Sequence, residues 1–351
     1  MRRAAFAVLS AVLVAAVLGA PVSASPAGTV DDPYSGRQWG LTQIQARDAW
    51  DVSRGVGAVV AVLDTGVDLT HPDLDDNIIS FPDADMIDPD GRDGAQDEDG
   101  HGTHVAGIIA AEAGNGIGVA GTSPRATILP VRVLGPDGGT TAQIADGIRY
   151  AVRHGAKVIN LSLGYDLRGH LAGVTGGLGP VHDAIETAWQ SGAVIVVAAG
   201  NDSVPLCSQP STERVLCVGS VDRNEIRSWF SNSDATMTRP FLVAPGGDSL
   251  GGFSLGDSTT SSLFCNGDVI STYLRTEGSY CAGQPGYESL GGTSMAAPFV
   301  SGVAALLSAQ GHSNQEIVDC LVRTASDLGA PSRDPIYGYG RVDALAAVTN
   351  C

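Results

Sequence analysis

The segments DTG at 64–66, HGTHVAG at 101–107 and GTSMAAP at 292–298 carry most of the information in this chain. In that order they supply a carboxylate, an imidazole and a hydroxyl, the three groups of a charge-stabilised serine nucleophile. Asp, then His, then Ser is one of the three chain orders in which this arrangement recurs. A fourth segment, AAGN at 198–201, lies between the second and the third.

Short apolar runs alternate with helical patterns along the chain. The runs are nearly continuous in apolar residues, as strands covered on both faces are, and they span Ala58–Leu63, Ile128–Leu134, Val158–Leu163, Val194–Ala198 and Val215–Val218. Helical spacing occurs over 144–152 before Gly155 and over 184–189 before Gly192. This alternation predicts an α/β fold with a central, mostly parallel twisted sheet and right-handed crossovers.

In such a sheet the active site lies beyond the carboxyl ends of the strands. Asp64 and Asn201 each follow an apolar run, so both are expected at that edge. His101 and Ser294 each begin a helical pattern. The chain shows no internal repeat and no linker, so residues 31–351 are expected to form one large domain.

The N-terminus has the pattern of an export signal over residues 1–24. Arg2 and Arg3 precede an apolar stretch, and Val22-Ser23-Ala24 offers a small-residue cleavage site. The alternative of a membrane anchor is disfavoured because the apolar stretch is shorter than the ~20 residues that a bilayer needs. We therefore expect a secreted, extracellular protein that does not bind membranes once the signal is removed.

The charge balance is strongly acidic, with 38 Asp and Glu against 20 Lys and Arg and a net charge of −18. Loss of Arg2 and Arg3 with the signal makes it more negative still. This balance argues against nucleic-acid binding, and it suits a protein that carries bound cations.

Six cysteines in an exported chain indicate three disulfides. Several pairings are formally possible. Proximity along the chain favours Cys207–Cys217, Cys265–Cys281 and Cys320–Cys351. Free thiols and a metal cluster are the alternatives, and the oxidising compartment and the lack of a CxxC pair argue against them.

The four segments together resemble those of the subtilisin-like serine proteases (the subtilase family), thermitase-type members most closely, over roughly residues 31–348. The resemblance implies a three-layer fold with helices on both faces of the sheet. It also implies that Asp64, His101 and Ser294 form a catalytic triad. Asn201 and the Ser294 backbone N–H would then form the oxyanion hole. The structural alternatives are a turn for Asp64 and Asn201, a packed histidine for His101 and a helix cap for Ser294.

The same resemblance implies a groove for extended polypeptide substrates. Its backbone-binding residues would be Gly138, Gly139, Ser162, Leu163 and Gly164. Ala198, Ala199 and Gly200 would line the pocket for the side chain before the scissile bond. Such small residues leave room for a large apolar group.

Structural calcium is the cofactor that the resemblance implies. The first site would use Asp32, Asp73 and Asn115 with the main-chain oxygens of Glu112, Ile117 and Val119, a hard oxygen set that suits Ca²⁺. A second, weaker candidate comprises Asp85, Asp88 and Asp90. The alternative for the second group is a solvated acidic loop.

Two features depart from the family pattern. Residues 246–286, rich in Gly, Ser and Thr, resemble a disulfide-braced insertion, and only the short segment 25–30 separates the signal from the domain. The leading interpretation is a monomeric, broad-specificity, secreted serine endopeptidase. The alternatives are a processing protease of a secretion pathway and a non-catalytic, peptide-binding subtilisin fold.

Overall fold

The computed structural model describes residues 31–88, 93–164, 179–208, 212–248, 265, 267–277 and 281–351. The predicted signal peptide, residues 1–24, and the segment 25–30 lie outside the described residues. So do Asp90 and much of the predicted insertion.

Six strands form one sheet in the order β2-β1-β3-β4-β5-β6, and every neighbouring pair is parallel. The strands are β1 (Val59–Asp64), β2 (Thr127–Arg132), β3 (Val158–Leu161), β4 (Val194–Ala198), β5 (Val215–Val221) and β6 (Phe241–Pro245). The predicted parallel sheet is confirmed, and its five predicted strands lie within a few residues of their expected bounds. β6 was not predicted.

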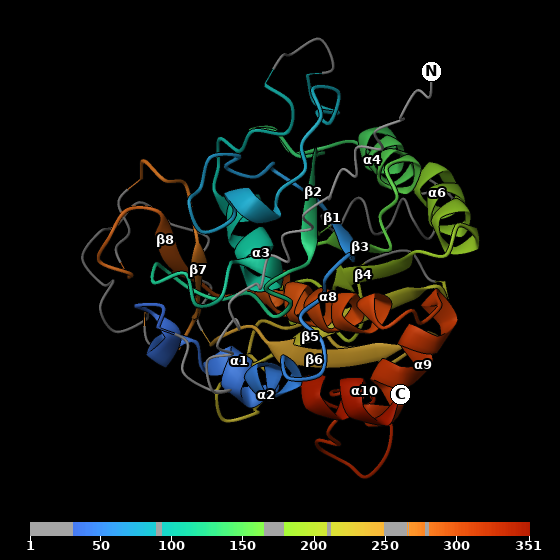
Figure 1. The fold of residues 1–351 in the computed structure, drawn as a ribbon. Coiled ribbons are helices and arrows are strands. Elements are labelled where there is room, and N and C mark those ends of the chain that lie inside the picture. Colours follow the sequence, from blue (N-terminus) through green and yellow to red (C-terminus); the bar gives the residue numbers. More distant parts are fainter. Residues whose placement is uncertain are drawn as a thin grey trace, which may run out of the picture.

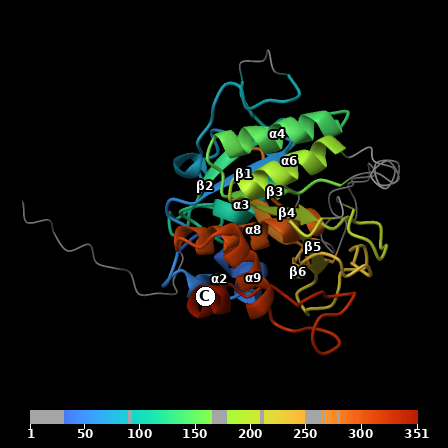
Figure 2. The ribbon, with the colours of Figure 1, turned by 90° about the vertical axis from the view of Figure 1, so that its right-hand side faces the viewer.

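Four long helices cover the two faces of this sheet (Figures 1 and 2). They are α3 (His101–Ala110), α4 (Thr141–Arg153), α6 (Gly179–Gln190) and α8 (Thr293–Ala309). Ala61 and Leu63 of β1 belong to the buried cluster that includes α4 and α6. Val60 and Val62 belong to the cluster that includes α3 and α8. Alternate side chains of one strand therefore fill two separate cores, which makes a three-layer α/β fold.

Smaller elements complete the domain. A two-stranded antiparallel sheet contains β7 (Val269–Thr272) and β8 (Tyr287–Leu290). The remaining helical elements are η1 (Ser35–Arg37), α1 (Trp39–Gln43), α2 (Ala46–Ala49), η2 (Asp75–Asn77), α9 (Asn314–Thr324) and α10 (Ala344–Asn350). None of the helices in the described part of the chain combines the length and the apolar character needed to cross a membrane.

β7 lies within the predicted insertion, residues 246–286, yet it packs against α3. The Ser271 hydroxyl donates to the carbonyl of His104 at 2.8 Å, and the Thr272 hydroxyl donates to that of Thr103 at 2.7 Å. A part of this segment is therefore built into the layer that carries His101.

Three disulfides join the pairs that proximity along the chain favours: Cys207–Cys217, Cys265–Cys281 and Cys320–Cys351. The first ties a loop that follows β4 to β5, the neighbouring strand. The third joins α9 to the residue after α10.

Candidate active site

Three predicted site residues lie in one row across the carboxyl edge of the sheet. Val62 of β1 is level with Asn160 of β3, which is level with Val196 of β4. Two residues further along each strand, the same register brings Asp64, Ser162 and Ala198 into a row. Because parallel strands all end at this edge, residues distant in sequence meet there.

Asp64 and His101 are in direct contact. Asp64 ends β1 and is fully buried, and its Oδ1 lies 2.7 Å from Nδ1 of His101, the first residue of α3. Gly102 makes this approach possible. A Cβ at Gly102 would lie 2.1 Å from the carbonyl oxygen of Gly66, so only glycine fits where α3 meets the turn after Asp64.

Charges around His101 raise its pKa above the ordinary 6.5. Burial alone lowers this pKa, but the charge of Asp64 and its hydrogen bond outweigh burial, and Asp99 and Asp97 add to the increase. His104, three residues on, is different. Burial lowers the pKa of His104 to about 3, and its Nε2 lies 3.1 Å from each of two backbone carbonyls, so it is a neutral, structural histidine.

Ser294 is the second residue of α8, next to the carboxyl end of β3. Its hydroxyl donates to the carbonyl oxygen of Ser162 at 3.2 Å, and the Ser162 hydroxyl donates to the carbonyl oxygen of Ser294 at 2.8 Å. Within the described part of the chain, no hydrogen bond joins the Ser294 hydroxyl to His101. Such bonds often tighten only when substrate binds.

Asn201 is held by its side-chain oxygen next to the start of α8. Its Oδ1 accepts from the backbone N–H of Thr293 at 3.0 Å and from the Thr293 hydroxyl at 2.9 Å. The space where Gly292 lacks a side chain is 3.5 Å from Asn201 Nδ2 and 3.7 Å from the backbone nitrogen of Ser294. Met295 Sδ lies at 3.7 Å from the same point. Two nitrogen donors are therefore close to one point beside Ser294, an arrangement that an oxyanion hole would use.

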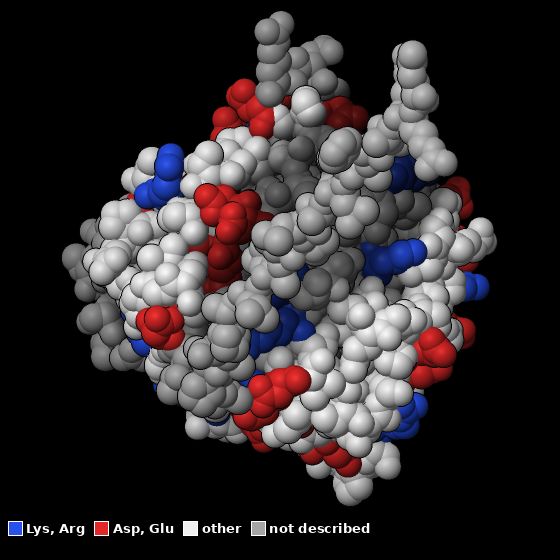
Figure 3. Space-filling view, in the orientation of Figure 1, with Lys and Arg blue, Asp and Glu red and all other residues white. Residues whose placement is uncertain are grey.

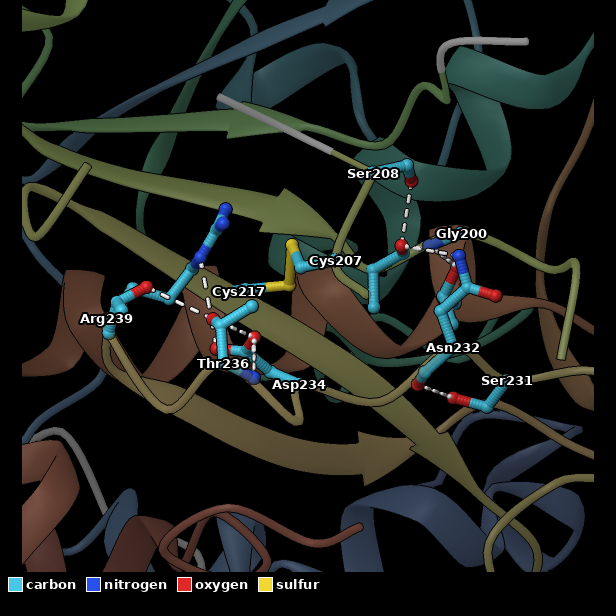
Figure 4. Close-up of a disulfide and its surroundings, with 12 residues drawn as sticks. Gly200, Cys207, Ser208, Cys217, Ser231, Asn232, Asp234, Thr236 and Arg239 are labelled. Carbon is cyan, nitrogen blue, oxygen red and sulfur yellow. Dashed lines mark hydrogen bonds and ion pairs between the residues drawn. A yellow bond between two sulfur atoms is a disulfide. The ribbon is translucent and has the colours of Figure 1, made fainter. Parts of the chain in front are cut away.

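Asn232 and Ser208 hold the loop after β4 in place (Figure 4). The carbonyl oxygen of Ala199 accepts from Asn232 Nδ2 at 3.0 Å and from the Ser208 hydroxyl at 2.7 Å. Asn232 Oδ1 accepts from the backbone N–H groups of Asp202 and Val204, each at 3.0 Å. The Cys207–Cys217 disulfide closes the end of the same loop. The backbone on either side of Asn201 is thus fixed by polar bonds.

The predicted groove residues fall into two separate segments. Gly138 and Gly139 are exposed, and Gly138 forms a tight turn with Gly135 through reciprocal backbone bonds of 2.9 and 3.0 Å. Ser162 and Leu163 are buried at the edge of the sheet, whereas Gly164 is exposed. Ala198, Ala199 and Gly200 continue from β4 beside them, and both alanines are buried.

The residues predicted for the first calcium site fit a cation. Asp32 and Asp73 are both buried, and within the described residues no basic side chain forms an ion pair with either. Asp73 accepts from Asn115 Nδ2 at 2.8 Å. Burial, reinforced by the charge of Asp32, raises the pKa of Asp73 to about 7.

The same loop offers free carbonyl oxygens. Among the hydrogen bonds of the described residues, none uses the main-chain oxygens of Glu112, Ile117 or Val119. Two buried carboxylates with no cationic partner, next to three unused carbonyls, form the oxygen-rich set that Ca²⁺ prefers.

The second candidate site is less favourable. Asp85 Oδ2 accepts from Arg132 at 3.3 Å, and its Oδ1 accepts from the backbone of Ile87 and Asp88, so a guanidinium already neutralises this carboxylate. A separate group of carboxylates that could hold a metal lies around η2 and comprises Asp75, Asp76 and Glu112. Figure 3 shows acidic side chains at several places on one face of the molecule.

Three residues of the site were not predicted from sequence: Asp97, Thr293 and Asn232. Thr293 orients Asn201, and Asn232 holds the loop around it. Asp97 binds the start of α3 and the turn after Asp64. Asp97 could have been recognised as a helix-capping residue, because it lies four residues before the helix that begins at His101. No local pattern in the sequence marks Asn232.

Comparison with known proteins agrees with this geometry. The model of the subtilase family matches residues 55–340. Thermitase of Thermoactinomyces vulgaris is 38% identical over 323 residues, which cover 91% of this chain and 99% of thermitase. Subtilisin BL of Lederbergia lenta is 37% identical over 316 residues, covering 88% of this chain and 97% of the subtilisin.

Among solved structures, a protease of Pseudoalteromonas arctica superposes with a TM-score of 0.74 at 35% identity, covering 92% of this chain and 99% of that protein. A lanthipeptide protease superposes with a TM-score of 0.73 at 27% identity, covering 91% of this chain and 96% of that one. The predicted family and fold class are confirmed, and the chain belongs to the subtilase family of serine endopeptidases.

Proposed function

We propose that Asp64, His101 and Ser294 act as a catalytic triad that hydrolyses peptide bonds through an acyl-enzyme. The observation that carries this proposal is the position of two nitrogen donors, Asn201 Nδ2 and the Ser294 nitrogen, which lie 3.5 and 3.7 Å from the point where a Gly292 Cβ would be. A serine that merely capped a helix would need no such second donor. The buried Asp64–His101 contact supports the same conclusion.

The chemistry follows from these positions. The Ser294 oxygen attacks the substrate carbonyl carbon while Nε2 of His101 takes the hydroxyl proton. Asp64 holds the imidazole through Nδ1 and stabilises its positive form. The oxyanion accepts hydrogen bonds from Asn201 and the Ser294 nitrogen. His101 then gives the proton to the leaving amine, and a water molecule repeats the sequence to release the acid and regenerate Ser294.

The substrates that this site suits are extended polypeptides. Gly138, Gly139 and the segment 162–164 would bind their backbone, which all peptides share, and thereby permit broad specificity. Ala198, Ala199 and Gly200 would line the pocket before the scissile bond. Their small side chains favour large apolar groups there.

We further propose that the protein is secreted after removal of residues 1–24 and is stabilised by calcium. Asp32, Asp73 and Asn115, with the carbonyls of Glu112, Ile117 and Val119, would hold the ion. When bound, calcium would neutralise the two buried carboxylates and brace the loop that continues from α3. Asp85, Asp88 and Asp90 stay a prediction for a second ion, with Arg132 already paired to Asp85.

The test is labelling of the protein secreted from the full-length chain by a fluorophosphonate, beside casein cleavage. We expect wild type to be labelled and to cut casein, and Ser294→Ala to do neither. Absence of labelling in a folded, calcium-loaded wild-type sample would overturn the triad and favour a peptide-binding subtilisin fold.

A further inference from the structure

Asp97 is a buried carboxylate that lies next to the catalytic pair without touching it. It is 4% exposed and accepts five hydrogen bonds. Its Oδ2 accepts from the backbone N–H of Thr103 at 3.0 Å and from the Thr103 hydroxyl at 2.6 Å. Its Oδ1 accepts from the Thr65 hydroxyl at 2.9 Å and from the backbone of Asp99 and Gly100.

These contacts help to cap the N-terminus of α3. A helix leaves its first N–H groups without internal partners, and the residue before His101 is Gly100, which has no side chain to cap them. The N–H of His101 donates to Asp99 Oδ1 at 3.2 Å, and that of Thr103 donates to Asp97. The N–H of Gly102 donates to the Thr65 hydroxyl at 3.0 Å.

Thr65 gives this cap its connection to Asp64. It directly follows Asp64, and its hydroxyl accepts from α3 while donating to Asp97. Its backbone N–H donates to Asp64 Oδ1 at 2.8 Å, the same oxygen that contacts His101. Hydrogen bonds thus link Asp97 through Thr65 to Asp64 and to Gly102, the residue after His101.

We propose that Asp97 is a positioning residue: through Thr65 and Thr103 it holds the Asp64 turn and the first turn of α3 in the one relative placement that aligns Asp64 with His101. This inference rests on the proposed triad. The negative charge of Asp97 also contributes to the electrostatic potential at His101. The other ionisable groups that face His101 are Asp64 from β1, Asp99 from the loop and His104 from α3.

The test compares Asp97→Ala and Asp97→Asn with Glu98→Gln in protein secreted from the full-length chain. Glu98 is the matched control, because it is the adjacent carboxylate but is exposed and pairs with Arg132. We expect Asp97→Ala to lower kcat and the rate of fluorophosphonate labelling about 10- to 100-fold, with KM changed less than about twofold, because misplaced groups lose rate rather than binding. Glu98→Gln should match wild type in both measurements.

Three further readouts separate positioning from simple stability. The acid limb of kcat/KM in Asp97→Asn should move to lower pH, since a negative charge facing His101 is removed. The far-downfield proton resonance of the His101 Nδ1–H should broaden or shift. Thr65→Val should lower kcat, Thr65→Ser should restore it, and the loss in a Thr65→Val, Asp97→Ala double variant should be smaller than the product of the single losses.

A wild-type labelling rate in Asp97→Ala, with only the melting temperature lowered, would overturn the inference and leave the triad intact. Strictly multiplicative losses from Thr65 and Asp97 would overturn it too. Absence of labelling in wild type would instead refute the proposed function. If Asp97→Ala fails to fold, Asp97→Asn and the Thr65 pair carry the same test.

Discussion

The two halves of the active site differ in how many of the contacts needed for the proposed reaction are already formed. On one side, Asp64 and His101 already lie 2.7 Å apart, and five hydrogen bonds to Asp97 secure the elements that carry them. On the other side, Thr293 fixes Asn201, but the Ser294 hydroxyl donates to the carbonyl oxygen of Ser162. The proposed charge-stabilising pair is therefore already in contact, whereas the described residues show no hydrogen bond between the Ser294 hydroxyl and His101.

This difference has an energetic reason. Aligning a buried carboxylate with an imidazole during each turnover would require repeated reorganisation of charge in a low-dielectric site. Rotating one hydroxyl between two acceptors costs far less, because the exchanged hydrogen bonds are similar in strength. In the proposed mechanism the Asp64–His101 pair would thus carry the charge, and the group that would rotate, the Ser294 hydroxyl, is neutral and small.

The largest expected effect is on the nucleophile side. Ser294→Ala should lower kcat by about 10⁶-fold, because the covalent route is lost. Its melting temperature should stay close to wild type, since among the described residues the hydroxyl donates a single bond, to Ser162. Casein cleavage and calorimetry check both statements, and a variant that retained more than about 1% activity would contradict the role of Ser294.

Asn201→Ala should lower kcat by about 10²- to 10³-fold with little change in KM, because its amide nitrogen would act on the transition state. Thr293→Val should have a smaller effect, since Asn201 Oδ1 keeps the backbone N–H of Thr293. Steady-state kinetics on one peptide substrate measure the ranking. If Thr293→Val lowered kcat as much as Asn201→Ala, the Thr293 hydroxyl, and not its backbone N–H, would determine the orientation of the Asn201 amide.

Calcium removal should act mainly on the half that contains His101, because the loop of Asn115 continues from α3. If the ion is present at about 100 times its Kd, its loss costs about 2.7 kcal/mol of unfolding free energy, which corresponds to a melting temperature lower by about 4 °C for a domain of this size. Hydrogen exchange should rise in α3 more than in α8. Asp73→Ala should abolish the response to chelator, and an unchanged wild-type melting temperature would refute the site.

The smallest expected effect is on the pH dependence of kcat/KM. Asp64, Asp99 and Asp97 raise the pKa of His101, and only neutral His101 can accept the serine proton, so kcat/KM should fall as the pH drops through that raised pKa. Asp99→Asn removes a negative charge and should therefore move this acid limb to lower pH, by about 0.3–0.5 units at low salt. The shift should shrink as salt is added; an upward shift would contradict the sign of this interaction.

Much of the fold could be predicted because buried parallel strands have a simple pattern. Val194–Ala198 is wholly apolar and was predicted with its observed bounds. β7 and β8 were not predicted, because each has four residues and polar residues such as Ser271 and Glu288 interrupt them. Strands this short are formed by packing on α3 and not by their own propensity.

For the site, the sequence marks the groups that are proposed to react but not those that hold them. His101 and Ser294 are marked by their glycine-rich surroundings, which are local. Asn232 bonds to Ala199, Asp202 and Val204 about 30 residues away, and the pairing of β4 with β5 helps to bring them together. Residues whose roles depend on such distant contacts carry no local pattern.

The shared row of Asp64, Ser162 and Ala198 has one last consequence. β1 and β4 are separated only by β3, so the width of the site is two strand spacings, or about 10 Å. That width is set by backbone hydrogen bonds, which are the same for any sequence. The loops that follow the strands can therefore differ in length and in substrate specificity while the dimensions of the reaction centre stay constant.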